Sequence, residues 1–403
     1  MHTYRELFGI REFRVLFGLR AVVITGVVVS SLAIGTVIYR VTGSPLLTSL
    51  ALFGGPLVQL LTSHFLLAGS DLLRPRTAMV ISATTAGGTD LLQLLPGLTW
   101  PIRFVILAAG YVVLAATSGT VVALLSDIVP REAFVLARST LNITVGGMQI
   151  AGNGVGAILL IWLSGRDLFW ISGTVTLAGA LAARIGLRDH PPRASGKVVA
   201  RTRAVNRMLL GSAAVRPIYL MIWIPNGLVV GCEALYIPYA GGHAGYLFAA
   251  TATGMLAGDV VIGRFLPEDR RDRLIVPLRI LLALPFIAFA WQPVLGVAAA
   301  LGMVGAFGYP ASLPLQERLV SHTAADSRGQ VFGLAGTGLM VGQALGAAIA
   351  GGVADLLGAG STAAGRTMTV MAVLSLLATA LIVPGLRRTT PTPGRSVEPD
   401  VAD

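Results

Sequence analysis

The chain has 403 residues, of which 54% are hydrophobic and only 12% are charged, and its mean hydropathy is +0.77. Soluble proteins carry about 25% charged residues, so this composition excludes a soluble globule and predicts an integral membrane protein. The net charge of +11 is assigned to loops on the anionic, cytoplasmic side of a membrane, and nucleic-acid binding is not expected.

Apolar blocks of about 20 residues, the length that spans a bilayer, follow one another along the chain. The first is expected to be a retained helix, because no signal-peptide cleavage pattern follows it. The blocks fall at 17–40, 45–68, 77–97, 102–126, 139–163, 168–186, 217–240, 245–265, 274–292, 294–314, 329–353 and 367–386. They predict twelve membrane-spanning helices, with both termini on one side.

The basic residues predict which side that is. With both termini inside, all of the 30 basic residues except Arg40, Arg103, Arg166 and Arg366 fall on the inner side. Basic loops stay in the cytoplasm, so we expect a multi-pass protein of the plasma membrane with cytoplasmic termini. Lys197 is the only lysine, a bias typical of GC-rich bacterial genomes.

The longest polar connection divides the chain into two halves. It lies between the sixth and seventh blocks and contains RDHPPRASGKVVARTRAVNR. We therefore predict an N-terminal six-helix bundle at 1–187, a cytoplasmic linker at 188–215 and a C-terminal six-helix bundle at 216–388. The Pro-rich, polar segment 389–403 is predicted to be a disordered cytoplasmic tail.

A glycine pattern recurs in the two halves. AGNGVGA at 151–157 holds Gly152 and Gly156, and GQALGAA holds Gly342 and Gly346 at a spacing of 190 residues. Pairs of small residues four apart allow membrane helices to pack closely. No strand precedes either run, which argues against a dinucleotide-binding loop. The repeat indicates a duplicated six-helix unit with these glycines at helix contacts.

Two segments resemble a known family. VIYRVTGSPLLTSLALFGGPLVQLL resembles the first two helices of bacterial major-facilitator proteins of the drug and macrolide efflux type. This resemblance implies an all-α membrane protein whose twelve transmembrane helices form two pseudo-symmetric six-helix bundles, the major-facilitator fold.

LLAGSDLLRPRTAM resembles the family's cytoplasmic gate motif, G-x-L-A-D-R-x-G-R-R, although leucine replaces its first glycine and first arginine. The resemblance implies a latch in which a carboxylate pairs with basic groups across the cytoplasmic side. The alternative is a set of ordinary loop charges. The predicted gate residues are Asp71, Arg74, Arg76, Asp259 and Arg264.

Helix five resembles the efflux motif G-P-x-x-G-G, with Asn153 in place of its proline. Asn153 and Gln343 occupy matching positions in the two halves. Their amides can hydrogen-bond between helices or face a cavity and contact substrate, and the sequence leaves both open.

Helix seven contains Glu233 within an apolar span. A carboxylate there costs roughly 3 kcal/mol at the helix centre, so a functional role is the default expectation. Glu233 can couple transport to protons or anchor a cationic substrate, unless it is a neutral group bonded to a neighbouring helix or reaches external water. Asn226 and Tyr236 join it as candidates, while Tyr309 and other aromatic residues can stack on a flat substrate. A second acidic residue, Asp90, is expected to pair with Arg103.

The sequence contains no recognisable catalytic or nucleotide-binding motif, and no metal site or cofactor is predicted. We expect a monomeric transporter, not an enzyme, that works in the lipid bilayer and exchanges protons for a small amphipathic compound or drug by alternating access. Two alternatives are a carrier of one metabolite and a non-transporting membrane sensor or partner with the same fold.

Overall fold

The computed structural model of the chain describes residues 4–66, 74–117, 120–130, 134–190, 207, 210–322 and 328–388. Every regular element in these ranges is a helix. Helices suit a membrane interior because each backbone N–H and C=O finds its partner within the same segment. The prediction of an all-helical chain is therefore confirmed for the described residues.

In the first half, short breaks separate long helices. After the second helix, Gly43 adopts a left-handed backbone with φ of 65°, and the Ser44 hydroxyl then accepts a bond from the N–H of Leu47 at 3.2 Å. Glycine favours a helix end and serine a helix start. The helices are α1 (Tyr4–Gly9), α2 (Arg11–Thr42), α3 (Pro45–Phe53), α4 (Gly55–Leu66), α5 (Pro75–Leu92), α6 (Trp100–Thr117), α7 (Thr120–Ile128), α8 (Phe134–Trp162) and α9 (Gly165–Gly186).

The second half follows the same plan, with more 3₁₀ geometry. The 3₁₀ segment η3 begins next to Pro285, whose missing N–H cannot continue an α-helix. The elements are α11 (Arg216–Ala234), α12 (Tyr236–Ala240), η2 (Gly241–His243), α13 (Ala244–Phe265), α14 (Glu268–Arg273), α15 (Ile275–Ala283), η3 (Leu284–Trp291), α16 (Leu295–Ala306), η4 (Tyr309–Ala311), α17 (Ser312–Ser321), α18 (Arg328–Leu356) and α19 (Gly360–Arg387).

Seven stretches of described helix are long and apolar enough to cross a membrane, or eight if α3 and α4, which meet at 61°, form one span. The structure thus supports a multi-pass membrane protein. Several of the predicted apolar blocks are divided between two shorter helices because glycine or proline interrupts them, as at Gly54 and Pro285.

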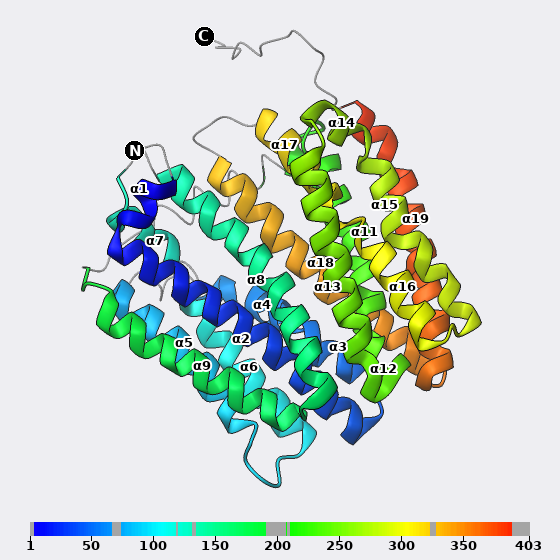
Figure 1. Cartoon of the computed structure of the whole chain (residues 1–403), viewed down its shortest axis with the longest axis horizontal. Helices are drawn as coiled ribbons and strands as arrows, with labels where there is room; N and C mark the ends of the chain where they lie inside the picture. Colours follow the sequence, from blue (N-terminus) through cyan, green and yellow to red (C-terminus); the bar gives the residue numbers. More distant parts are fainter. Residues whose placement is uncertain are drawn as a thin grey trace.

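The two halves lie on opposite sides of the molecule. In Figure 1 the N-terminal helices α2, α5 and α9 lie on one side, and the late helices α15, α16 and α19 lie on the other. Between them, α3 packs against α18 and α8 packs against α13. The beginning of α1 and the end of α19, the first and last described helices, lie at the same end of the bundle (Figure 1). We call this the terminal end and the opposite one the far end.

The recurring glycines lie at tight helix contacts. A Cβ on Gly346 of α18 would lie 1.9 Å from the carbonyl oxygen of Gly227 on α11, and a Cβ on Gly227 would lie 2.3 Å from the carbonyl oxygen of Gly342. In the first half, a Cβ on Gly152 would lie 3.1 Å from Val28 of α2, and one on Gly156 would lie 2.7 Å from the Leu32 side chain. Corresponding helices in the two halves therefore pack through corresponding glycines.

Contacts between the halves gather at the far end. Asp355, near the end of α18, accepts bonds from the Ser44 hydroxyl at 2.8 Å and from the N–H of Leu46 at 3.3 Å. The Tyr39 hydroxyl donates to the carbonyl oxygen of Pro238 on α12 at 3.3 Å. These bonds join α2 and α3 to α12 and α18 and hold the halves together at the far end.

Candidate functional site

A cavity of about 390 Å³ lies between the halves and is lined by both of them. Such a volume is in the range of small-molecule sites. Its lining extends from Arg20 and Val121, toward the terminal end, to Leu32 and Leu52, which lie nearer the far-end contacts. Most of its lining is apolar, and the polar side chains include Arg20, Ser31, Gln59, Glu233, Tyr309 and Gln343.

Glu233 is the only carboxylate among the described residues that line this cavity. It lies near the end of α11, and only 8% of the residue is exposed. The Tyr309 hydroxyl donates a hydrogen bond of 2.5 Å to Glu233 Oε1. Tyr309 begins the 3₁₀ segment η4, which contains Pro310 and follows the end of α16. From the sequence we expected Tyr309 only to stack on a substrate. Its hydrogen bond to Glu233 is a finding of the structure.

Arg279 lies behind Tyr309. This arginine, which we expected on the inner side, lies within α15 and is 0% exposed. Its Nε, Nη1 and Nη2 have no hydrogen-bond partner among the described residues, and Tyr309 lies nearby. Burying an unpaired guanidinium in an apolar interior costs free energy. Because Arg279 lies near the Tyr309–Glu233 pair, we expect it to have a function there.

The amides predicted for the site have different surroundings. Gln343 lines the cavity, and its Nε2 donates to Asn226 Oδ1 at 3.0 Å across the α11–α18 contact. Gln343 thus bonds to a neighbouring helix and also faces the cavity, while its contact with substrate stays a prediction. Asn226 itself is buried. The backbone of Asn153 lies in α8, and its side chain is outside the described part of the structure.

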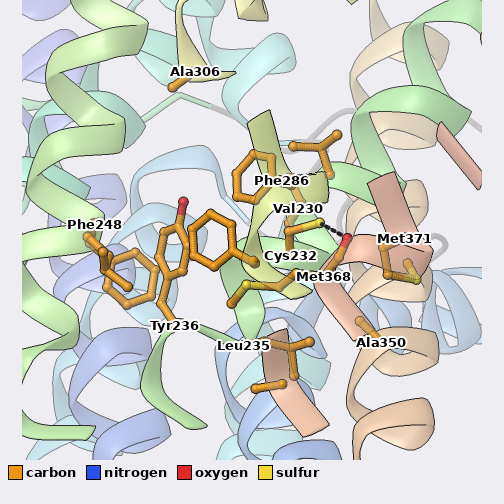
Figure 2. Packing of buried hydrophobic residues seen from close by; sticks show 14 of the residues in the cluster. Val230, Cys232, Leu235, Tyr236, Phe248, Phe286, Ala306, Ala350, Met368 and Met371 are labelled. Carbon is orange, nitrogen blue, oxygen red and sulfur yellow. Dashed lines mark hydrogen bonds between the residues drawn. The ribbon is translucent and has the colours of Figure 1, made fainter. Parts of the chain in front are cut away.

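Tyr236 lies in the apolar core of the second half. Figure 2 shows its ring beside those of Phe248 and Phe286, with Cys232 and Met368 nearby. Its hydroxyl lies 2.9 Å from the hydroxyl of Thr251. The ring packs behind the cavity, because Tyr236 is absent from the cavity lining while Phe248 belongs to it.

The predicted gate residues are only partly described. Asp71 lies outside the described residues, as does the side chain of Arg264. Arg74 forms an ion pair with Asp189, just after α9, and Arg76 Nη2 lies 3.9 Å from the same carboxylate. Asp189 is therefore a partner that the motif did not reveal. Asp259 lies in α13 and is partly exposed.

Asp90 does not form the pair that we expected. Arg103 instead donates from Nη1 to the Gln93 carbonyl oxygen at 2.9 Å and to Gln93 Oε1 at 3.2 Å. Asp90 accepts from Ser30 of α2 and lies 2.5 Å from the Ser172 hydroxyl of α9. The rotation of α5 about its axis, which the sequence alone does not give, points the Asp90 carboxyl toward α2 and α9 and away from Arg103.

No family model matches the chain, and no curated protein is similar to it in sequence. Solved structures match it over nearly their whole length. A bacterial homolog of the human lysosomal transporter Spinster, in an inward-facing and occupied conformation, has a TM-score of 0.66 and 13% identity, with 94% of this chain and 98% of that chain covered.

Two further matches are described with different small molecules. A POT family transporter in complex with 5-aminolevulinic acid has a TM-score of 0.67 and 11% identity over 94% of this chain and 97% of that chain. A D-xylose-proton symporter has a TM-score of 0.62 and 13% identity over 92% of this chain and 95% of that chain. The chain therefore has the fold of these transporters. At such low identity the likeness extends to the fold and not to the substrate.

Proposed function

We propose that the chain is a major-facilitator transporter that exports a small amphipathic compound in exchange for protons across a bacterial plasma membrane. Its twelve helices would form two bundles, 1–187 and 216–388, with cytoplasmic termini. The observation that carries the proposal is the position of Glu233 in a largely apolar cavity lined by both halves. One of the similar structures is a D-xylose-proton symporter, and its name is consistent with proton coupling in this fold.

In this proposal the structure is the state open toward the cytoplasm. The bonds of Asp355 and Tyr39 hold the far end closed. Rocking of the two bundles would break them and expose the cavity to the outside. Helices α11 and α18 belong to the same half and pack closely through their glycines, so they would move together.

Glu233 would exchange substrate for a proton. The apolar lining suits the hydrophobic part of an amphipathic cation, and the Glu233 carboxylate suits its charge. Protonation from outside would remove that charge and release the cation. Loss of the proton to the cytoplasm would restore the binding site. Tyr309 stabilises the carboxylate by its hydrogen bond, and Arg279 supplies a fixed positive charge behind Tyr309.

Accumulation of a lipophilic fluorescent cation in a pump-deficient bacterium tests this function. Cells with the wild-type chain should accumulate less dye than empty cells, and both a protonophore and Glu233→Gln should abolish the difference. Equal expression in the membrane is the control. Accumulation equal to that of empty cells would reject export of this class of compound and would favour a carrier of one metabolite.

A further inference from the structure

A second buried carboxyl lies apart from Glu233, in the first half. Asp90 of α5 is 5% exposed and reaches two serines on two other helices, Ser30 on α2 and Ser172 on α9. The proposed exchange at Glu233 does not use it. Its hydrogen bonds, however, indicate its protonation state.

The Ser172 hydroxyl has two partners but only one hydrogen. Its Oγ lies 2.8 Å from the carbonyl oxygen of Gly26 and 2.5 Å from Asp90 Oδ2. A backbone carbonyl can only accept, so both contacts can be full hydrogen bonds at once only if the Ser172 hydrogen goes to Gly26. The contact with Asp90 is then a hydrogen bond only if Asp90 Oδ2 carries a proton and donates it. Ser30 donates to the other oxygen, Oδ1.

The surroundings also favour a neutral acid. From α2 and α9, the groups that reach Asp90 are the two serine hydroxyls. From α6, Tyr111 is the titratable group that interacts with it, while Arg103 is bonded to Gln93. Among the described residues no cation is paired with Asp90. A lone carboxylate in an apolar interior is costly, whereas a fully hydrogen-bonded acid is not.

Asp90 also adjoins the central cavity. A small cavity of about 30 Å³ is lined by Asp90 and Ser30 together with Val27, Tyr111 and Leu114. The last three residues also line the central cavity. The small cavity has room for about one or two water molecules, which can pass a proton between the carboxyl and the central cavity once the three side chains between them move.

We propose that Asp90, Ser30 and Ser172 form a second proton-binding site, separate from Glu233, which holds a proton in this conformation. The proton passes from Asp90 Oδ2 through water to the central cavity and leaves a carboxylate that the two hydroxyls can solvate. Use of this proton in transport rests on the proposed function, but its presence on Asp90 does not.

Infrared spectroscopy of the full chain in lipid bilayers tests the site directly. The probe is the C=O stretch of protonated carboxyl groups, recorded at neutral pH without substrate as the difference between protein labelled with ¹³C at its aspartate carboxyls and unlabelled protein. The wild type should show a protonated-aspartate band. Asp90→Asn should remove it, and Glu233→Gln should leave it unchanged.

Ser30→Ala supplies a second readout that keeps the carboxyl. It removes the hydrogen bond to Oδ1, so the band should persist and move to higher frequency. Absence of the band from the wild type, or its persistence in Asp90→Asn, would overturn the proposal. Because no transport is measured, a failed dye assay leaves this result intact, and a missing band leaves the role of Glu233 intact.

Discussion

Tyr309 donates a hydrogen bond of 2.5 Å to Glu233 Oε1, and this bond joins α11 to the 3₁₀ turn η4 at the wall of the central cavity. The two residues lie 76 positions apart in the sequence. Glu233 is the only carboxylate in the described cavity lining, and the buried guanidinium of Arg279 lies near Tyr309.

Loss of that bond should impair proton-driven export. Tyr309→Phe removes one hydrogen bond to a charged group, worth about 1.5–3 kcal/mol, and should lower dye export about tenfold or more. Tyr236→Phe is the matched control, because its hydroxyl pairs with Thr251 and not with Glu233. Equal export by both variants would show that the Tyr309 hydroxyl has no special role.

We expect Arg279 to lower the free energy of unfolding of the protein and yet to support dye export. Arg279→Met fills a similar volume without an unpaired charge and should raise the free energy of unfolding by about 1–4 kcal/mol, while dye export falls. Arg318→Met is the control, because Arg318 Nη2 bonds to Asp272 at 2.7 Å and Nη1 to the Leu386 carbonyl oxygen at 3.1 Å. That variant should lose stability. Thermal unfolding in detergent measures both, and a lower midpoint for Arg279→Met would contradict the account.

The α11–α18 contact should not tolerate a methyl group. Gly346→Ala would bring a Cβ to 1.9 Å from the backbone of Gly227, and overpacking of this kind costs about 1–3 kcal/mol. Gly352→Ala, later in the same helix, meets no atom within 4 Å and should be neutral. The comparison is thermal unfolding of the two variants, and equal midpoints would show that the helices lie farther apart.

Asp355 should control closure of the far end. Asp355→Ala removes the bonds to Ser44 and Leu46, so the closed state should become less populated, by about tenfold for a loss of 1.4 kcal/mol. Ser49 is 0% exposed beside this contact. In a Cys232→Ala background, a Ser49→Cys thiol should react with an external, membrane-impermeant maleimide faster when Asp355 is also replaced.

The exposed Ser361 provides the control for that labelling. A Ser361→Cys thiol should react at the same rate with and without Asp355→Ala. An unchanged rate at position 49 would mean that the Asp355 bonds do not hold the far end closed.

Much of the fold could be predicted because its signals are local. Apolar blocks and glycine spacing predicted the helices and the role of Gly342 and Gly346 at a helix contact, and the structure places both glycines there. Their partners Gly227 and Gly231 have the same spacing in helix seven. Two small residues four apart are typical of a close helix contact, so the sequence also carries a signal for these partners.

The candidate site could be predicted less well, because its bonds depend on helix register and rotation. The cost of an intramembrane carboxylate drew attention to Glu233, but nothing near it in the sequence indicates Tyr309. Arg279 lies within an apolar block, and nothing near it in the sequence indicates that it lies near Tyr309. Asp90 and Arg103 are close in sequence, yet they face different partners.

Proton-driven dye uptake into proteoliposomes, with and without Glu233, tests the central claim most directly. An imposed proton gradient should drive a lipophilic fluorescent cation across the membrane against its own gradient when the wild-type chain is present. Glu233→Gln should abolish both this gradient-driven accumulation and dye-for-dye exchange, because it removes the charge that binds the cation. Gradient-driven accumulation by Glu233→Gln equal to that of the wild type would contradict the account, because the proton would then be carried elsewhere.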